Sequence, residues 1–115
     1  MIRKNVSEPW FSLIATGQKT VEGRLDKGGF APGDVIMWTN DQLGFERSFR
    51  TRVVAVATYG SFRAMLKAET LRATLPAFGV TSVEKGVAVY RRFYDAESEK
   101  KHGVAAIRLE VLPRA

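Results

Sequence analysis

Apolar and polar residues alternate along several short stretches of the chain, and alternation with a period of two predicts β-strands. In the first stretch, Thr20, Glu22 and Arg24 occupy one face of the extended chain, and small or apolar residues occupy the other. A second stretch is nearly all apolar, a third is long and rich in valine, and a fourth alternates again near the C-terminus. We therefore expect strands over residues 19–25, 35–39, 45–58 and 104–111.

Apolar residues at intervals of three and four predict helices in other parts of the chain. Ser7-Glu8-Pro9 offers a hydroxyl cap, an acidic first turn and a tolerated proline to a helix that ends at Gly17. Ser61 is the expected cap of a second helix. Thr81 and Glu84 have the spacing of a capping box at the start of a further helix. The apolar face of that helix comprises Val83, Val87, Tyr90 and Tyr94.

The order of these elements predicts the fold class. A helix, three strands, two or three helices and a last strand follow one another without the alternation of a βαβ sheet, and strands far apart in sequence must pair. We expect an α+β fold: a small, partly open β-barrel of about five strands, flanked by helices. The 115 residues contain no linker or repeat and are too few for two ordinary domains, so residues 1–115 are expected to form a single domain.

The composition excludes several classes of protein. The chain has no Cys and one His, His102, which excludes disulfides and thiolate sites and argues against a His-rich metal site. No apolar run approaches the ~20 residues of a membrane helix, and residues 1–5 are not followed by the apolar core of a secretory signal. We expect a cytoplasmic protein that does not contact membranes and has no metal site and no cofactor.

The charge balance suggests a class of partner. Lys and Arg number 18 against 12 Asp and Glu, which gives a net charge of +6 and a basic isoelectric point. Such an excess attracts polyanions, of which RNA and DNA are the commonest in a cell. From charge alone, a nucleic-acid-binding protein and a basic protein that binds no polyanion are equally compatible with the sequence. The basic residues are dispersed, as on a folded surface.

The richest cluster of candidate site residues is the segment 17–24, which carries Lys19, Glu22 and Arg24. These three side chains either form a solvated strand face or line a cleft. In a cleft, burial of their charges is costly unless they form ion pairs with one another or bind a ligand. Gly23 between them allows a backbone or a flat ligand to approach closely. Candidates for stacking a base are Trp10, Trp38, Phe45, Tyr59 and Tyr94. Of these rings we favour Trp38, at the end of a strand next to a loop, over simple core packing.

This segment belongs to a pattern that covers nearly the whole chain. The pattern consists of Trp10-Phe11-x-x-Ile14-x-x-Gly17-x-Lys19-Thr20-Val21-Glu22-x-Arg24, Pro32-Gly33-Asp34, Val54-x-Val56-x-x-Tyr59-x-Ser61-Phe62-x-x-Met65-Leu66, Tyr90-x-x-Phe93-Tyr94 and Gly103-Val104-x-Ala106-Ile107. It resembles the ASCH domain family, a branch of the PUA-like superfamily, from Glu8 to Leu112. The resemblance implies a stand-alone small ASCH protein.

The resemblance also implies a function. ASCH domains are small β-barrels with helices around a cleft, proposed to bind RNA, and the cleft is lined by the segment that corresponds to residues 17–24. One branch hydrolyses the acetyl amide of N4-acetylcytidine with a lysine, a threonine and a glutamate, and another member is a metal-dependent ribonuclease. The lysine matches Lys19, but Glu22 stands where the threonine would be. Thr20 is the neighbouring hydroxyl, and Glu69 is a loose match for the glutamate.

Three hypotheses follow for the function. The first is an RNA- or nucleoside-binding protein whose cleft is formed by Lys19, Glu22 and Arg24, with Trp38 and Tyr59 as further ligand-binding residues. The second is a hydrolase of acetylated cytidine or a ribonuclease, with Lys19 and Glu22 as catalytic residues and Thr20 and Glu69 as secondary candidates. A divalent metal is implied only for the ribonuclease. The third is a protein-interaction module with an incidental cleft.

Apart from Glu69, acidic residues outside the segment 17–24 are not expected to form a metal-binding or catalytic site. Asp34, Asp41 and Glu46 lie in turns without the spacing of a metal site. Glu97 and Glu99 are expected to face water. The oligomeric state is left open by the sequence.

Overall fold

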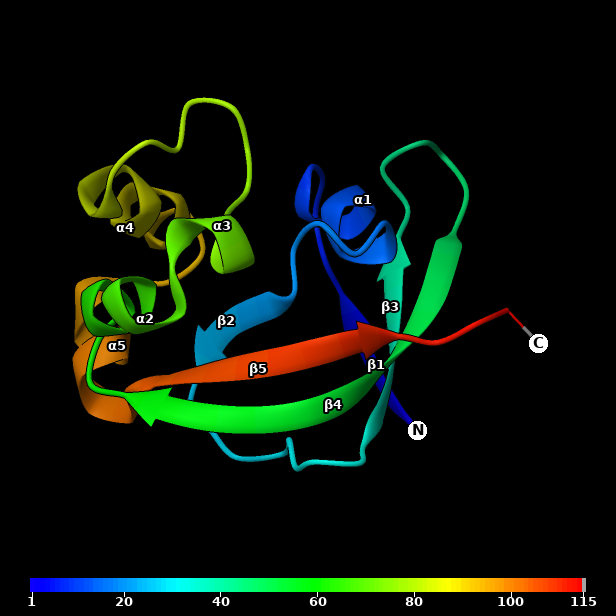
Figure 1. Cartoon of the computed structure of the whole chain (residues 1–115), viewed down its shortest axis with the longest axis horizontal. Helices are drawn as coiled ribbons and strands as arrows, with labels where there is room; N and C mark the ends of the chain where they lie inside the picture. Colours follow the sequence, from blue (N-terminus) through cyan, green and yellow to red (C-terminus); the bar gives the residue numbers. More distant parts are fainter. Residues whose placement is uncertain (115) are drawn as a thin grey trace.

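The structure is a computed structural model and describes residues 1–114 (Figure 1). Residues 1–114 form ten helices and strands. In order they are β1 (Ile2–Asn5), α1 (Trp10–Ala15), β2 (Val21–Leu25), β3 (Val35–Asn40), β4 (Arg47–Tyr59), α2 (Phe62–Glu69), α3 (Leu71–Thr74), α4 (Val83–Arg91), α5 (Ala96–His102) and β5 (Val104–Val111). Within residues 1–114, no helix is long and apolar enough to cross a membrane.

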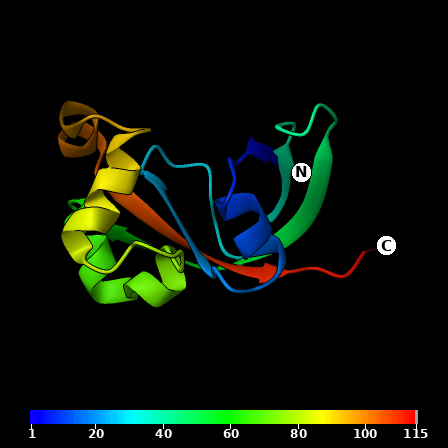
Figure 2. The same cartoon turned by 90° about the horizontal axis from the view of Figure 1, so that it is seen from above.

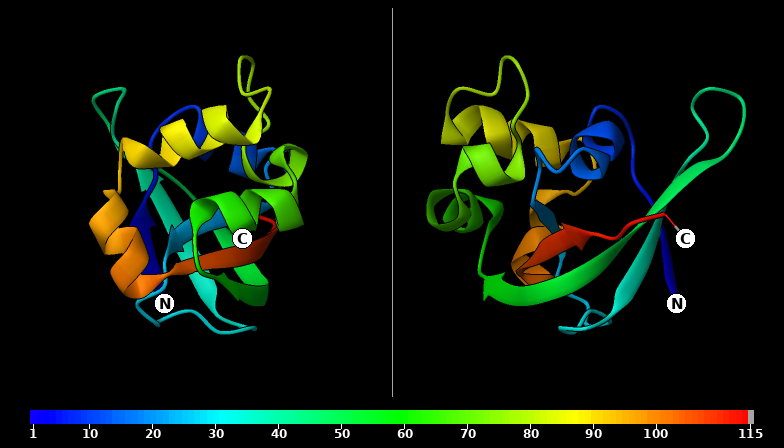
Figure 3. Two further views of the ribbon diagram at one scale, coloured as in Figure 1. Left: turned by 90° about the vertical axis from the view of Figure 1, so that its left-hand side faces the viewer. Right: turned by 45° about the vertical axis from the view of Figure 1, so that its right-hand side comes forward.

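The long strand β4 makes the sheet curl. It pairs antiparallel with β3 over Arg47–Arg52 and with β5 over Thr51–Tyr59, so it belongs to both halves of the sheet. The pairing with β5 shifts register between Val53 and Ala55, and such a bulge bends a strand and increases its twist. Figure 3 shows β4 sweeping from the helices at one end toward the hairpin at the other.

The five strands have the order β1-β3-β4-β5-β2, so β1 and β2 are the two edges. The pair β1–β3 is parallel and the other pairs are antiparallel. The curl brings the edges close enough for one side chain to span them: Arg24 on β2 donates a hydrogen bond from Nη2 to the carbonyl oxygen of Asn5 on β1, at 2.9 Å. The expected α+β fold, a partly open five-stranded barrel flanked by helices, is confirmed.

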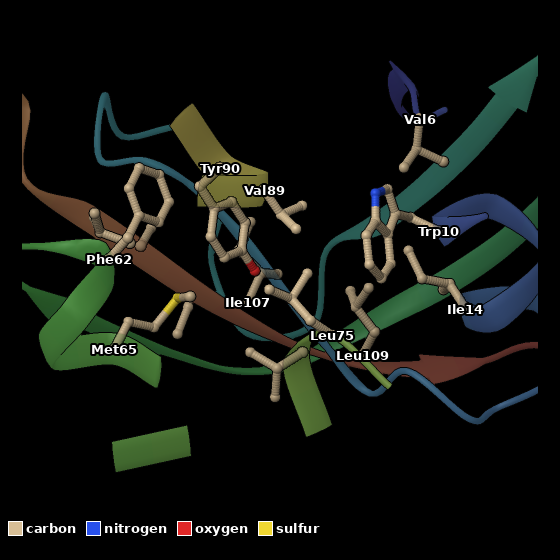
Figure 4. Close-up of a cluster of buried hydrophobic side chains, with 14 of the residues drawn as sticks. Val6, Trp10, Ile14, Phe62, Met65, Leu75, Val89, Tyr90, Ile107 and Leu109 are labelled. Carbon is tan, nitrogen blue, oxygen red and sulfur yellow. The ribbon is translucent and has the colours of Figure 1, made fainter. Parts of the chain in front are cut away.

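The helices divide into two groups around the sheet. Figure 2 shows α2–α5 gathered at one end, while α1 lies within the curve near β3. Between the sheet and these helices lies a core of apolar side chains, part of which Figure 4 draws. Trp38, Phe62, Met65 and Ile107 are among its fully buried members. The core therefore joins the helical end to the sheet, and α2, α3 and α5 contact the edge strand β2.

Two features at the start of the chain differ from expectation. Residues Ile2–Asn5 form an edge strand that the pattern did not indicate. The first helix begins at Trp10, with Pro9 at the N-cap and no side-chain cap from Ser7. Instead, the Glu8 carboxylate accepts hydrogen bonds from the backbone N–H and the hydroxyl of Ser12. The first turn is thus held by an acid side chain and not by a hydroxyl.

The helices between β4 and β5 number four, where two or three were expected. Ser61 caps α2 as predicted, by accepting from the backbone N–H of Ala64. The cap of α4 is Ser82 and not Thr81, because the Ser82 hydroxyl accepts from the Lys85 N–H. The helices without an individual prediction are the short α3, capped by Thr70, and α5, where the Asp95 carboxylate provides the cap.

Candidate functional site

A cleft of about 170 Å³ opens between β2, the segment that joins β1 to α1, and the C-terminal half of α4. The sheet supplies its floor, with Glu22, Gly23 and Arg24 of β2 and the neighbouring Lys19. Its remaining lining residues are Asn5, Val6, Ser7, Trp10, Leu75, Val89, Tyr90, Phe93 and Tyr94. The cleft therefore combines a charged floor with walls that are largely apolar and aromatic.

Lys19 is the deepest charged residue of the floor, with 1% of its surface exposed. Its Nζ donates to the carbonyl oxygens of Val21, at 2.7 Å, and Thr74, and lies 3.3 Å from Glu22 Oε1. The Trp10 ring lies 5.6 Å from Nζ, within cation–π range. Burial lowers the pKa of Lys19, and the adjacent Glu22 charge opposes that shift. The ammonium is thus held by three oxygens and an aromatic face.

Glu22 connects the two cations of the cleft. Its Oε1 faces Lys19, and its Oε2 lies 3.2 Å from Arg24 Nη2 and 3.3 Å from Arg24 Nε. The side chain is buried, so the two cations compensate the cost of removing a carboxylate from water. One carboxylate and two cations give the floor a formal charge of +1. Such a floor can offer acceptors through Glu22 and donors through Arg24.

Arg24 lies at the boundary between the floor and the solvent. Its guanidinium packs 5.3 Å from the Trp38 ring, and its Nε and Nη2 make the contacts to Glu22 and Asn5 described above. An arginine has five N–H donors, and those of Nη1 take no part in these contacts. The side chain is partly exposed, so its free donors can reach a ligand in the cleft.

Aromatic rings from α4 and the segment after it form one wall. Phe62 stacks on Tyr90 with centroids 4.3 Å apart and planes 9° apart, and it also stacks on Tyr94 at 5.5 Å. Phe93 lines the cleft with 54% of its surface exposed. The sequence pattern assigned Tyr90 and Tyr94 to the apolar face of a helix. Three aromatic residues, Tyr90, Phe93 and Tyr94, lie close together at the end of that helix. This clustering was the sequence signal that could have indicated a ligand-binding wall.

The structure does not bring Trp38 and Tyr59 into the cleft. Trp38 is fully buried in the middle of β3, its indole N–H donates to the Thr51 hydroxyl at 2.8 Å, and Arg24 covers one face. The preference for Trp38 as a stacking ring is therefore corrected: it supports Arg24 from below. Tyr59 lies at the end of β4 and donates a hydrogen bond to Glu69, which raises the pKa of its phenol.

The two secondary catalytic candidates also lie outside the cleft. Glu69, on α2, accepts from Tyr59 and lies 3.5 Å from Arg108. Thr20 is exposed and borders a separate surface hollow with Gln18 and Arg72. Lys19 and Glu22 are therefore the two members of the proposed catalytic set that the fold places together.

Glu99 is a buried carboxylate that sequence reasoning placed in water. Its Oε2 accepts from the Phe62 N–H at 2.7 Å, at the first residue of α2, and its Oε1 pairs with Arg91 at 2.9 Å. A carboxylate is favourable at a helix N-terminus because the first N–H groups have no partners within the helix. Glu99 thereby ties α5 to α2 and α4 behind the aromatic wall.

Acidic and histidine side chains do not assemble elsewhere into a metal-binding group: among residues 1–114, no three of them cluster in a way that could hold an ion. Asp34 accepts from the Ala31 N–H within its own turn. Glu46 pairs with Arg3 at the surface.

The fold is an α+β half-barrel of the PUA-like class, a class often linked to RNA binding. The family model described as "ASCH domain" matches residues 5–113. The chain belongs to the ASCH domain family. Comparison with curated proteins finds no match.

Solved structures agree with this assignment. The crystal structure of a hypothetical protein, PH0355, has 38% sequence identity and a TM-score of 0.83, and the match covers 96% of this chain and 97% of that one. Protein PF0455 from Pyrococcus furiosus, solved by NMR, has 41% identity and a TM-score of 0.76, with 98% of each chain covered. An ASCH protein from Zymomonas mobilis has 16% identity and a TM-score of 0.67, over 94% of this chain and 65% of that one, which shows a shared fold.

Proposed function

We propose that this protein binds single-stranded RNA or a nucleoside, with one base inserted in the cleft. The observation that carries the proposal is the pairing of a buried carboxylate and a partly exposed guanidinium, Glu22 and Arg24, beneath an aromatic wall. Protein recognition of RNA bases commonly combines hydrogen bonds to the base edge with stacking on aromatic rings. The net charge of +6 supports attraction of the phosphate backbone to the rest of the surface.

Each floor residue has a distinct role in this proposal. Glu22 accepts a hydrogen bond from an exocyclic amine of the base or from a ribose hydroxyl. Arg24 donates from its free N–H groups to a base carbonyl or to a phosphate at the mouth of the cleft. Lys19 is a positioning residue, because its ammonium is enclosed by protein oxygens and holds Glu22 in place.

Stacking falls to Phe93 and Tyr94 in this proposal, because these rings line the cleft and retain exposed surface. Pockets for drug-sized ligands have volumes of roughly 300–1,000 Å³. A cleft of about 170 Å³ suits a single base with its sugar and phosphate outside. This size favours an unpaired nucleotide over a helical segment of RNA.

A hydrolase is the second candidate, and one observation favours it: burial lowers the pKa of Lys19, as a general base requires. Against it, Glu22 favours the charged amine, and Thr20 lies outside the cleft, so the hydroxyl nucleophile of the amidohydrolase branch has no equivalent on the floor. Incubation with N4-acetylcytidine, and with total RNA with and without Mn²⁺, tests turnover. Product formation that is lost in Glu22→Gln would support the hydrolase.

The binding proposal is tested by fluorescence anisotropy with a labelled single-stranded RNA. Arg24→Gln is expected to weaken binding about ten- to a hundredfold, because hydrogen bonds to charged groups contribute about 1.5–3 kcal/mol. The matched control is Arg63→Gln on α2, which removes the same charge from an exposed pair with Glu84 of α4, and neither residue lines the cleft. Equal effects of the two substitutions would contradict the proposal, since only total charge would then matter.

A further inference from the structure

The hydroxyl group of Tyr90 is buried without a hydrogen-bond partner. Tyr90 has 4% of its surface exposed, and within residues 1–114 its hydroxyl oxygen meets no donor or acceptor. Buried polar groups in proteins are nearly always hydrogen-bonded, and each exception calls for an explanation. Tyr90 lines the cleft, so the explanation can lie in what the cleft binds.

The ring of Tyr90 is held in one place. Phe62, itself fully buried, stacks on one face with nearly parallel planes. Figure 4 shows the hydroxyl oxygen directed away from Phe62, toward the middle of the cluster that also contains Val89 and Leu75. The hydroxyl therefore cannot swing away to find a partner elsewhere in the protein.

The hydroxyl also lies against the floor of the cleft. A Cβ on Gly23 would be 3.0 Å from the Tyr90 oxygen and 2.8 Å from Cε of Met65. Gly23 lies between Glu22 and Arg24 along β2, and all three residues line the cleft together with Tyr90. The absence of a side chain at Gly23 thus allows the Tyr90 hydroxyl to lie directly against β2.

The protonation state of this hydroxyl is fixed. Burial raises the pKa of Tyr90 well above its ordinary value, and the negative charge of Glu22 raises it further. The phenol therefore keeps its proton at neutral pH and offers one O–H donor. A neutral donor between a carboxylate and apolar side chains is suited to a neutral acceptor.

We infer that Tyr90 donates a hydrogen bond to the ligand at the deep end of the cleft, and that this end takes the edge of a neutral nitrogen heterocycle and not a phosphate. This inference rests on the proposed function and specifies the chemical group of the ligand that enters the deep end of the cleft. The acceptor is a carbonyl oxygen or an unprotonated ring nitrogen, and the neighbouring Glu22 takes an N–H from the same edge. A phosphate at that depth would face the Glu22 carboxylate and apolar Val89 and Leu75, so phosphates bind outside, near Arg24.

The test is Tyr90→Phe, which removes one oxygen and preserves the stacking on Phe62. Its matched control is Tyr59→Phe, whose hydroxyl is bonded to Glu69 outside the cleft. Binding of adenosine, cytidine, guanosine, uridine and inorganic phosphate is measured by titration calorimetry for both variants and the wild type. Single-stranded tetranucleotides, intact or with one abasic position, are measured in the same way, and thermal unfolding is recorded for each protein.

The expected results separate the two tyrosines. Tyr90→Phe is expected to weaken binding of the preferred nucleoside and of the intact tetranucleotide about three- to tenfold, with phosphate binding unchanged and the melting temperature unchanged or higher. Tyr59→Phe is expected to lower the melting temperature and to leave binding unchanged. An abasic position is expected to remove most of the affinity of a tetranucleotide.

Two outcomes would overturn the inference separately from the proposed function. If the wild type binds RNA or nucleosides and Tyr90→Phe binds equally well, the base-binding role of Tyr90 is wrong while the proposed function stands. If Tyr90→Phe lowers the melting temperature without affecting binding, its hydroxyl is satisfied by an internal water and is structural. A wild type that binds none of these probes would overturn the proposed function and this inference with it.

Discussion

Lys19 has the environment of a structural cation. An ammonium group has three N–H donors, and Lys19 has three oxygens around it, from Val21, Thr74 and Glu22. Lys19→Met would leave the Glu22 carboxylate with Arg24 as its remaining cation and would leave two buried carbonyls unpaired. Because breaking a buried ion pair costs about 3–5 kcal/mol, we expect a loss of that size in the free energy of unfolding, measured with urea.

The control for this prediction is Lys67→Met. Lys67 is exposed on α2, and exposed substitutions away from special features usually change stability by less than about 0.5 kcal/mol. Similar losses in the two variants would show that Lys19 is not the buried, fully paired cation described here. For the same reason Lys19→Ala is a poor probe of binding, since it would disturb the floor as a whole.

At the residue scale, the sequence predicted the types of the site residues better than their surroundings. The alternation along β2 placed Glu22 and Arg24 on one face, and both line the cleft. Burial of Trp38 could not be predicted, because it depends on Arg24 and Thr51, which reach it from two other strands. The position of the Tyr90 hydroxyl depends on contact between α4 and β2, which no local pattern encodes.

Among the elements, the packing of α2 against α4 depends on a residue without a side chain. A Cβ on Gly86 of α4 would be 2.8 Å from Leu66 Cδ1 and 3.1 Å from Leu71 Cδ2. Leu66 is buried and cannot move freely. We therefore expect Gly86→Ala to destabilise the protein by about 1–3 kcal/mol, although alanine favours helix.

Ala88 provides the comparison on the same helix. It is exposed, so Ala88→Gly is expected to cost about 1 kcal/mol through helix propensity alone. The free energies of unfolding of both variants, measured by chemical denaturation, test these two predictions. Stabilisation by Gly86→Ala would mean that α2 and α4 pack less closely than described.

The entry to α1 gives a prediction for pH. Burial raises the pKa of Glu8, but its hydrogen bonds from Ser12 and its pair with Arg47 outweigh this effect and leave the pKa below its ordinary value of 4.5. The folded state therefore binds this proton less readily than the unfolded state, and the stabilisation is present above about pH 4.5 and lost below it. The difference in unfolding free energy between wild type and Glu8→Gln should shrink as the pH falls from 7 to about 3. A constant difference would contradict the assignment.

At the scale of elements, the strands were predicted more completely than the helices. Strands β2–β5 follow from alternation and apolar runs, within a few residues at their ends. The edge strand β1 was missed because three of its four residues are polar and exposed. Its strand conformation comes from parallel pairing with β3, a long-range contact that the local pattern does not show. Helix α5 was missed because its one buried residue, Glu99, is charged and so gave no apolar face.

For the whole molecule, charge and cleft should respond differently to salt. The net charge of +6 is spread over the surface, and affinity for single-stranded RNA falls with a logarithmic salt slope of about −0.7 for each phosphate neutralised. A nucleoside has no phosphate, so its binding in the cleft should change little between low and high salt. Titrations of a tetranucleotide and of the corresponding nucleoside at several salt concentrations compare the two. Equal salt dependence would mean that the nucleoside does not enter the cleft as proposed.

The most direct test of the central claim is an NMR titration of the protein with a single-stranded RNA tetranucleotide. Chemical shifts of the backbone amides report which surface the RNA contacts. The account predicts that the largest changes occur at residues 22–24 of β2 and 90–94 at the end of α4, with smaller changes for the abasic tetranucleotide. Changes concentrated on residues 50–52 of β4, outside the cleft, with residues 22–24 unaffected, would contradict it.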